Sequence, residues 1–142
     1  MKLAIVYTSV TGNTKELAEE IYRCFRKKSI DTTMYSIDEF QEPLTQFNAV
    51  VIGTYTWGNG EIPKEMRKLF EAFEALACQD VTTAVFGTGD SCYPHYCGAV
   101  DLFRDMLYVH TNLAATLKVE LRLQPNDRGR CQRFAESILN RM

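Results

Sequence analysis

The chain has 142 residues, 46% of them hydrophobic, and a formal net charge of −2; this length suits one compact domain over residues 1–142 and is too short for two. Its five cysteines include no Cys-x-x-Cys pair and its two histidines are not joined by clustered carboxylates, so we expect reduced thiols and no metal site. The first apolar run stops at Thr8, which is too short for a signal peptide or a membrane span, so we expect a cytoplasmic protein without membrane contact.

Strand and helix signals alternate along the chain, a pattern typical of the α/β class. Continuous apolar runs predict interior strands, whereas apolar and polar residues alternate over Leu117–Leu123 and predict an edge strand with one face in solvent. In chain order, the strands are expected at Lys2–Tyr7, Asp31–Ile37, Ala49–Ile52, Ala84–Phe86 and Thr116–Leu123. Helical spacing predicts helices at Asn13–Lys28, Lys64–Leu76, Val100–Asn112 and Arg128–Met142. Pro63 suits the first turn of the second helix, and Asp127 suits the N-cap of the last.

A polar loop separates the first strand from the first helix. It holds hydroxyls, an amide and a glycine but no lysine or arginine: Thr8, Ser9, Val10, Thr11, Gly12, Asn13 and Thr14. At a helix N-terminus the free backbone N–H groups and the helix dipole favour an anion, and Gly12 lets the backbone come close. Neither a Walker loop nor a dinucleotide fingerprint is present. The loop therefore predicts a phosphate pocket of another kind, with an ordinary capped turn as the alternative.

Two further motif loops follow the third and fourth predicted strands. They cover Gly53–Gly60 and Gly87–Asp101 and are rich in glycine, hydroxyl and aromatic residues. Because parallel strands place their carboxyl ends at one edge of the sheet, all three loops should converge there.

The first loop resembles the phosphate loop of the flavodoxins, whose pattern is Thr/Ser-x-Thr-Gly-x-Thr. The other two loops resemble the segments that flank the flavin in that family, and the three motifs stand in the family's order. The resemblance covers the whole chain and implies a doubly wound, five-stranded parallel sheet in the order 2-1-3-4-5 with helices on both faces. The uninterrupted last strand resembles that of the short-chain flavodoxins.

One noncovalently bound FMN is the cofactor that this resemblance implies, because the chain offers one phosphate pocket and no second nucleotide fingerprint. The ring would be bound by Thr54, Tyr55, Thr56, Trp57, Gly58, Asn59, Gly60, Thr88, Gly89, Asp90, Tyr93, Tyr96 and Cys97. By resemblance, Tyr93 covers the outer face and Trp57 the inner face, with a turn tyrosine and a core or surface-patch tryptophan as alternatives. The peptide at Gly58 and Asn59 would turn over on one-electron reduction, since glycine tolerates positive φ; a plain glycine turn is the alternative.

The family likeness implies a low-potential single-electron carrier, not an enzyme, that works through a neutral semiquinone. Residues 36–105 carry eleven acidic and four basic side chains, so we expect a negative face around the cofactor. A flavodoxin or ferredoxin reductase and electron-acceptor proteins would dock there, although solvated faces that happen to be acidic are the alternative. A basic patch interleaved with aromatic residues is missing, so nucleic-acid binding is not expected. We expect the protein to be a monomer.

The sequence departs from the family pattern at two places, and three other functions remain as alternatives. Asn59 is neutral where many relatives have aspartate, and Pro94-His95 occupies a stretch that is often acidic, so the second reduction should be less unfavourable. The alternatives are a specialist such as the flavoprotein of ribonucleotide reductase activation, a flavin-free regulatory domain and an NAD(P)H-dependent quinone reductase. The third strand ends in Gly53-Thr54 rather than the aspartate of a receiver domain, and no motif for a nicotinamide partner is visible.

Overall fold

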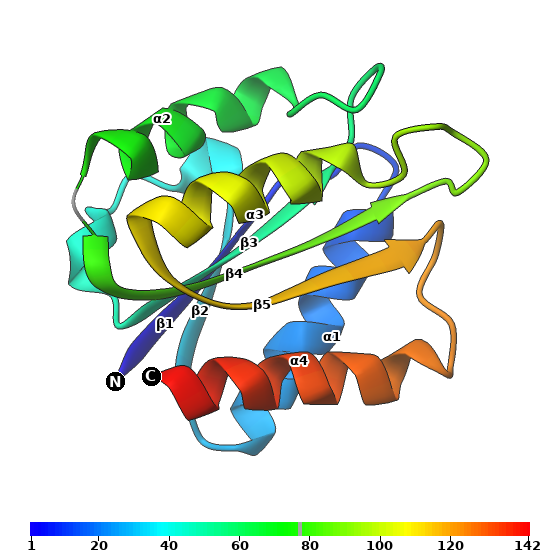
Figure 1. The fold of residues 1–142 in the computed structure, drawn as a ribbon. Coiled ribbons are helices and arrows are strands. Elements are labelled where there is room, and N and C mark those ends of the chain that lie inside the picture. The colour runs from blue at the N-terminus through cyan, green and yellow to red at the C-terminus, as the bar shows by residue number, and fades with distance from the viewer. Residues whose placement is uncertain (77) are drawn as a thin grey trace.

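A five-stranded parallel sheet forms the centre of the molecule (Figure 1). The structure is a computed structural model that describes residues 1–76 and 78–142. The strands are β1 (Lys2–Tyr7), β2 (Asp31–Ser36), β3 (Ala49–Tyr55), β4 (Cys78–Gly89) and β5 (Thr111–Glu120). They pair in the order β2-β1-β3-β4-β5, and every neighbouring pair is parallel, which confirms the predicted fold class. The order reverses between β1 and β3, and ligand crevices of such sheets lie at this point.

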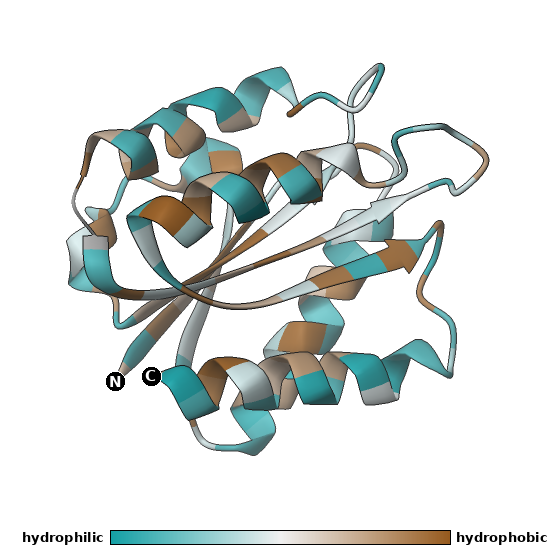
Figure 2. Ribbon diagram, viewed as in Figure 1, coloured by the Kyte–Doolittle hydropathy of each residue, from teal (hydrophilic) through white to brown (hydrophobic). Residues whose placement is uncertain are grey.

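Helices cover both faces of this sheet. In the described residues they are α1 (Asn13–Lys27), α2 (Arg67–Ala75), α3 (Gly98–His110) and α4 (Asp127–Arg141). Side chains alternate along β1, so Leu3 and Ile5 enter the core under α1 and α4, whereas Ala4 and Val6 enter the core under α2 and α3. Figure 2 shows hydrophobic residues along the strands and hydrophilic ones recurring along the helices, as expected for helices with one face in solvent.

Both β4 and β5 begin earlier than the apolar pattern predicts. β4 starts at Cys78 and β5 at Thr111, ahead of the expected starts at Ala84 and Thr116. Polar residues can occupy these buried positions because they satisfy one another: the hydroxyls of Thr83 and Thr111 are hydrogen-bonded at 2.6 Å.

The end of β5 also differs from the prediction. The strand stops at Glu120, so the expected strand is wrong over Leu121–Leu123. Leu121 has a φ of 55° and is 48% exposed, and its N–H donates to the Gly89 carbonyl oxygen at 2.6 Å. The chain therefore leaves the sheet beside the loop that follows β4, while Leu123 still packs against the core under α1 and α4.

The helix predicted over Lys64–Leu76 divides into two parts. Residues Lys64–Met66 form a 3₁₀ turn directly after Pro63, and the α-helix α2 begins only at Arg67. α3 begins at Gly98, before the predicted start. Within residues 1–76 and 78–142, no helix is long and apolar enough to cross a bilayer.

Asp127 is the first residue of α4 rather than its N-cap, which is Asn126. One carboxylate oxygen of Asp127 accepts the Gln124 N–H at 2.9 Å, and the other pairs with Arg130 at 3.0 Å. Its side chain thus closes the turn before the helix instead of capping the helix from outside.

Candidate functional site

Three loops meet at the carboxyl edge of the sheet, as the sequence pattern predicts. They follow β1, β3 and β4 and contain the predicted phosphate and ring segments, residues 8–14, 54–60 and 88–97. Hydrogen bonds join the three regions pairwise: from the Thr8 N–H to the Gly53 oxygen (3.0 Å), between the Thr14 and Thr88 hydroxyls (2.8 Å), and from the Ala99 N–H to the Thr56 hydroxyl (3.2 Å). The three loops therefore form one connected rim.

The first loop ends at the N-terminus of α1 in a conformation suited to an anion. Gly12 is the N-cap residue with a φ of 98°, which only glycine adopts without strain. The Ser9 hydroxyl oxygen accepts the N–H groups of Gly12 and Lys15, both at 3.2 Å. Among the described residues no acceptor is found for the N–H groups of Asn13 and Thr14. Those two donors and the positive end of the helix dipole are available to a phosphate.

Side chains of the first loop differ in how they are placed. Val10 and Thr11 face solvent, whereas Thr14 is only 2% exposed and lies against Thr88. A hydroxyl pair uses one proton, so one of the two hydroxyls still has a proton to donate to an anion.

Thr8, Thr54 and Tyr55 use their hydroxyl groups within the protein. The Thr8 and Tyr55 hydroxyls both donate to the Glu65 carboxylate, and the Thr54 hydroxyl donates to the Tyr55 carbonyl oxygen at 2.7 Å. None of the three residues lines the cavity between the second and third loops. Glu65 itself gave no signal in the sequence, since it is one of several carboxylates on an amphipathic segment.

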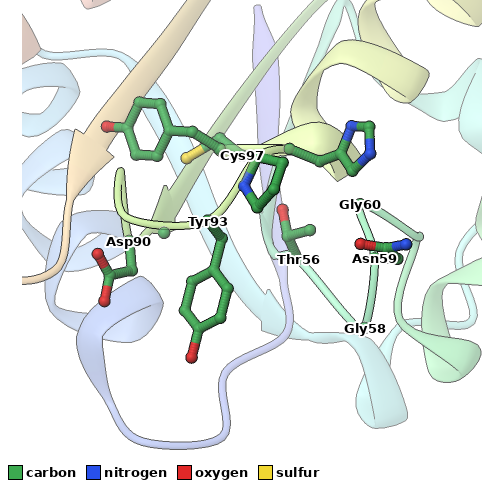
Figure 3. A pocket seen from close by; sticks show the side chains of 11 residues that line it. Thr56, Gly58, Asn59, Gly60, Asp90, Tyr93 and Cys97 are labelled. Carbon is green, nitrogen blue, oxygen red and sulfur yellow. The ribbon is translucent and has the colours of Figure 1, made fainter.

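A cavity of about 340 Å³ lies between the second and third loops (Figure 3). Its lining comes from both predicted ring segments: Thr56, Gly58, Asn59, Gly60, Gly89, Asp90, Tyr93, Pro94, His95, Tyr96 and Cys97. Figure 3 shows Tyr93 and the Gly58–Gly60 segment on opposite sides of this space. The structure thus brings most of the predicted ring residues together around one opening.

The two aromatic side chains predicted to flank a ring are both at the surface. Trp57 is 60% exposed and Tyr93 is 67% exposed. Trp57 therefore does not belong to the core, which removes one of the two alternatives for this residue and leaves a surface-patch tryptophan as the other. Tyr93 lines the cavity, whereas Trp57 is not among its lining residues. A large flat side chain at the edge of a cavity is suited to stacking on a planar ligand.

The segment from Trp57 to Glu61 is a tight hairpin. Trp57 and Glu61 exchange two backbone hydrogen bonds of 2.8 Å each, and the turn between them is Gly58-Asn59-Gly60. Gly58 has a φ of 51° and Gly60 a φ of 93°. A Cβ atom on Gly58 would meet only the Glu61 carboxylate, at 3.9 Å, so space does not restrict this residue and its backbone conformation does.

The third loop packs directly against this hairpin. A Cβ atom on Gly98 would lie 2.8 Å from the Gly60 Cα, and one on Gly60 would lie 2.7 Å from the His95 Cβ. Within the loop, the Asp90 carboxylate accepts the Cys92 N–H at 2.9 Å. The two loops can approach this closely only because both contact residues are glycines.

The two thiols of the third loop are poor nucleophiles. Burial raises the pKa of the Cys97 thiol to about 11, and hydrogen bonding to Asp90 raises the pKa of the exposed Cys92 thiol. Both thiols are therefore mainly protonated at neutral pH. In the described part of the chain, no group of three or more His, Cys, Asp or Glu side chains could hold a metal ion.

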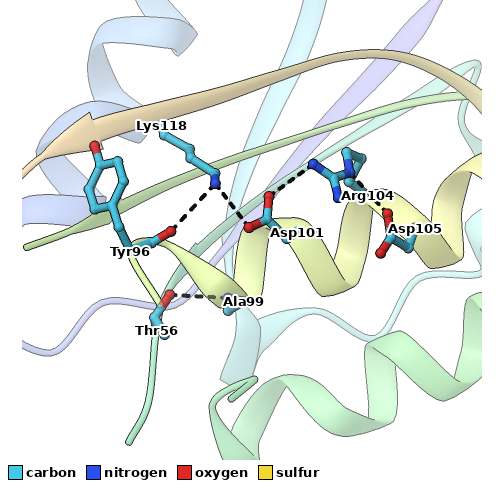
Figure 4. A network of polar contacts seen from close by, with 7 residues as sticks. All are labelled: Thr56, Tyr96, Ala99, Asp101, Arg104, Asp105 and Lys118. Carbon is cyan, nitrogen blue, oxygen red and sulfur yellow. Dashed lines mark hydrogen bonds and ion pairs between the residues drawn. The ribbon is translucent and has the colours of Figure 1, made fainter. Parts of the chain in front are cut away.

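Lys118 of β5 contacts both the third loop and the first turn of α3 (Figure 4). Its ammonium group donates to the Asp101 carboxylate at 2.9 Å and to the Tyr96 carbonyl oxygen at 3.4 Å, and lies 5.7 Å from the centre of the Tyr96 ring. Asp101 also pairs with Arg104 at 3.0 Å. The sequence marked Lys118 only as a polar position of an edge strand, because its contacts depend on how β5 lies beside α3.

Comparisons with known proteins agree with this geometry. The family model described as flavodoxin matches residues 5–110. Probable flavodoxin 1 of Bacillus subtilis (strain 168) is 36% identical over 143 residues, covering 97% of this chain and 90% of the relative. A flavodoxin of Maridesulfovibrio salexigens is 34% identical over 110 residues and covers 75% of each chain.

Solved structures give the same result. Oxidised flavodoxin 1 of Bacillus cereus superposes with a TM-score of 0.91 at 30% identity, covering 100% of this chain and 99% of that one. A flavodoxin of Streptococcus pneumoniae superposes with a TM-score of 0.92 at 29% identity over the full length of both chains. With its sheet order, its three converging loops and these likenesses, the chain belongs to the flavodoxin family, whose members are FMN-carrying electron-transfer proteins rather than enzymes.

Proposed function

We propose that residues 1–142 act as one domain that binds a single FMN noncovalently across the three loops. One observation carries this proposal: the N-terminus of α1, with backbone N–H groups available to an anion, lies on the same sheet edge as a cavity of about 340 Å³. The phosphate would bind the N–H groups of Asn13 and Thr14, supported by the hydroxyls of Ser9, Thr11 and Thr14. Because this pocket contains only neutral donors, binding relies on hydrogen bonds and the helix dipole rather than on ion pairs.

The ring would lie in the cavity between the two glycine-rich loops. Tyr93 would cover its outer face and Trp57 its inner face, which excludes water from the reacting edge. Backbone groups near Asp90 and Cys97 would bind the pyrimidine edge. The protonated thiol of Cys97 adds no charge there. Bound FMN would supply the redox chemistry, taking up and releasing electrons.

The Gly58-Asn59 peptide is the proposed redox-sensitive element. Gly58 has positive φ, and a Cβ atom there would meet only the Glu61 carboxylate, so a glycine with this freedom would allow the peptide to turn. In one orientation the Gly58 carbonyl oxygen would accept a hydrogen bond from a protonated flavin N5. This bond would favour the one-electron-reduced state over the oxidised state and so separate the two reduction steps.

We further propose that basic redox partners, a reductase and electron acceptors, dock around the exposed Trp57 and Tyr93 side chains. Asp90 and Glu61 flank this region, and the segment that contains it has far more acidic than basic residues. Partner docking should therefore weaken as ionic strength rises. We also propose that the protein is a cytoplasmic monomer.

Stepwise anaerobic reduction of the purified protein, followed by its absorption spectrum, tests this function. A yellow protein that accumulates a long-wavelength, blue one-electron form before bleaching supports the electron carrier. Direct two-electron bleaching would favour an NAD(P)H-dependent enzyme instead. A colourless chain that cannot be reconstituted with FMN would refute the proposed function.

A further inference from the structure

Glu65 connects two of the three loops through a single carboxylate oxygen. Its Oε2 atom accepts a hydrogen bond from the Thr8 hydroxyl at 2.7 Å and another from the Tyr55 hydroxyl, also at 2.7 Å. Thr8 opens the phosphate loop after β1, and Tyr55 ends β3 two residues before Trp57. Glu65 lies in the 3₁₀ turn Lys64–Met66, outside all the segments that the motifs single out.

Both hydrogen bonds have the character of charge-assisted bonds. Burial acts to raise the pKa of Glu65, but the hydrogen bonds from Tyr55 and Thr8 outweigh it and leave this pKa below its usual range. Burial and the bond to Glu65 raise the pKa of Tyr55 to about 12, so its hydroxyl stays a donor through the neutral range. A carboxylate between two hydroxyl donors makes stronger bonds than a neutral acceptor would.

The two hydrogen bonds to Glu65, called the Glu65 bridge below, lie where the pairing of β1 with β3 ends. The ladder between β1 and β3 fixes their spacing as far as the bond from the Thr8 N–H to the Gly53 oxygen. Beyond that point the two loops diverge, one toward α1 and the other toward the Trp57 hairpin. Glu65 is placed at this divergence and joins the first residue of one branch to the last strand residue of the other.

We propose that Glu65 is a positioning residue that sets the spacing between the phosphate loop and the ring loops. It would not touch FMN. A ligand that spans the phosphate loop and the ring loops gains affinity when their spacing is fixed in advance, whereas a ligand that contacts only the phosphate loop or only the ring loops does not. The inference rests on the proposed FMN function and adds a residue outside the three motifs.

Titration of the full, flavin-free chain with three probes tests this idea. FMN spans the phosphate loop and the two ring loops, lumiflavin carries only the ring and inorganic phosphate carries only the anion. For Glu65→Leu we expect the Kd for FMN to rise about tenfold or more, while the Kd values for lumiflavin and phosphate change less than about twofold. Glu65→Gln should stay within about threefold of the parent for FMN, because its amide oxygen can accept from both hydroxyls.

Tyr55→Phe is a milder variant that removes one of the two hydrogen bonds to Glu65 and keeps the aromatic ring at position 55. It should weaken FMN in the same selective way, by less than Glu65→Leu, so the test does not depend on one variant folding. Glu74→Leu on the exposed end of α2 is the matched control and should leave all three Kd values unchanged. Thermal unfolding of each flavin-free variant checks that it is folded.

The outcomes separate the bridge from the proposed function. An unchanged Kd for FMN in Glu65→Leu would overturn the bridge, and so would parallel losses for FMN, lumiflavin and phosphate, which indicate a general structural defect. If the parent chain itself does not bind FMN, the proposed function fails rather than the role of Glu65.

Discussion

Replacing Gly58 by valine tests whether this residue is the redox-sensitive point of the hairpin. Gly58 has a φ of 51°, and a side chain there would meet only the Glu61 carboxylate, at 3.9 Å. A β-branched residue would thus cost backbone energy without a steric clash. The penalty for a left-handed conformation is about 1–2 kcal/mol.

We assign this positive φ to the one-electron-reduced state, where the Gly58 carbonyl oxygen would face the flavin N5, and expect the oxidised state to adopt a φ that valine tolerates. On that assignment the penalty falls on the one-electron-reduced state. The relation of 59 mV per tenfold change for one electron gives about 43 mV for each kcal/mol. Gly58→Val should therefore lower the oxidised/semiquinone potential by roughly 40–90 mV and reduce the maximum amount of semiquinone, with oxidised FMN bound nearly as in the parent.

Spectroelectrochemical titration measures both quantities in one experiment. Asn59→Ala is the control, because Asn59 does not have positive φ and lies in the same turn. If Gly58→Val forms as much semiquinone as the parent at the same potential, the hydrogen bond to N5 does not come from Gly58. The Asn59-Gly60 peptide would then be the next candidate.

Three further results are expected. Thr11→Val combined with Thr14→Val should weaken FMN by about 3 kcal/mol but riboflavin much less, since both hydroxyls are proposed to bind the phosphate; equal losses in a binding titration would contradict this. Tyr93→Ala should raise the semiquinone/hydroquinone potential, because water replaces an aromatic screen over an anionic ring, while the free energy of unfolding changes little for a side chain that is 67% exposed. An unchanged potential in a redox titration would remove Tyr93 from the ring site. The free energy of unfolding of the flavin-free chain should fall above pH 9, because burial raises the pKa of Cys97 to about 11 and of Cys131 to about 12, so the unfolded chain loses these protons first. The loss, measured by urea unfolding across this pH range, should reach at most about 1.4 kcal/mol per pH unit for each thiol. Cys97→Ala with Cys131→Ala should remove the part due to these thiols and leave the part due to Tyr55 and Tyr96, whose pKa values are raised to about 12.

The sequence by itself determined the fold class and the location of the site. Interior strands of a parallel sheet must be apolar on both faces, so β1 and β3 stand out as continuous apolar runs. Loops that bind phosphate with backbone groups need glycine and hydroxyl residues just before a helix, and Thr8–Thr14 has this local composition. These signals are readable because each depends on neighbouring residues in the chain.

Only the tertiary structure decided which side chains serve the site and where the outer strands begin and end. β4 and β5 extend through polar residues because Thr83 and Thr111, far apart in sequence, satisfy each other's hydroxyl groups. Glu65 joins Thr8 to Tyr55, and Lys118 supports the loop around Tyr96, through contacts between separate elements. A single carboxylate or ammonium group can make many alternative hydrogen bonds, and its partner is selected by the packing of strands and helices that local sequence does not specify.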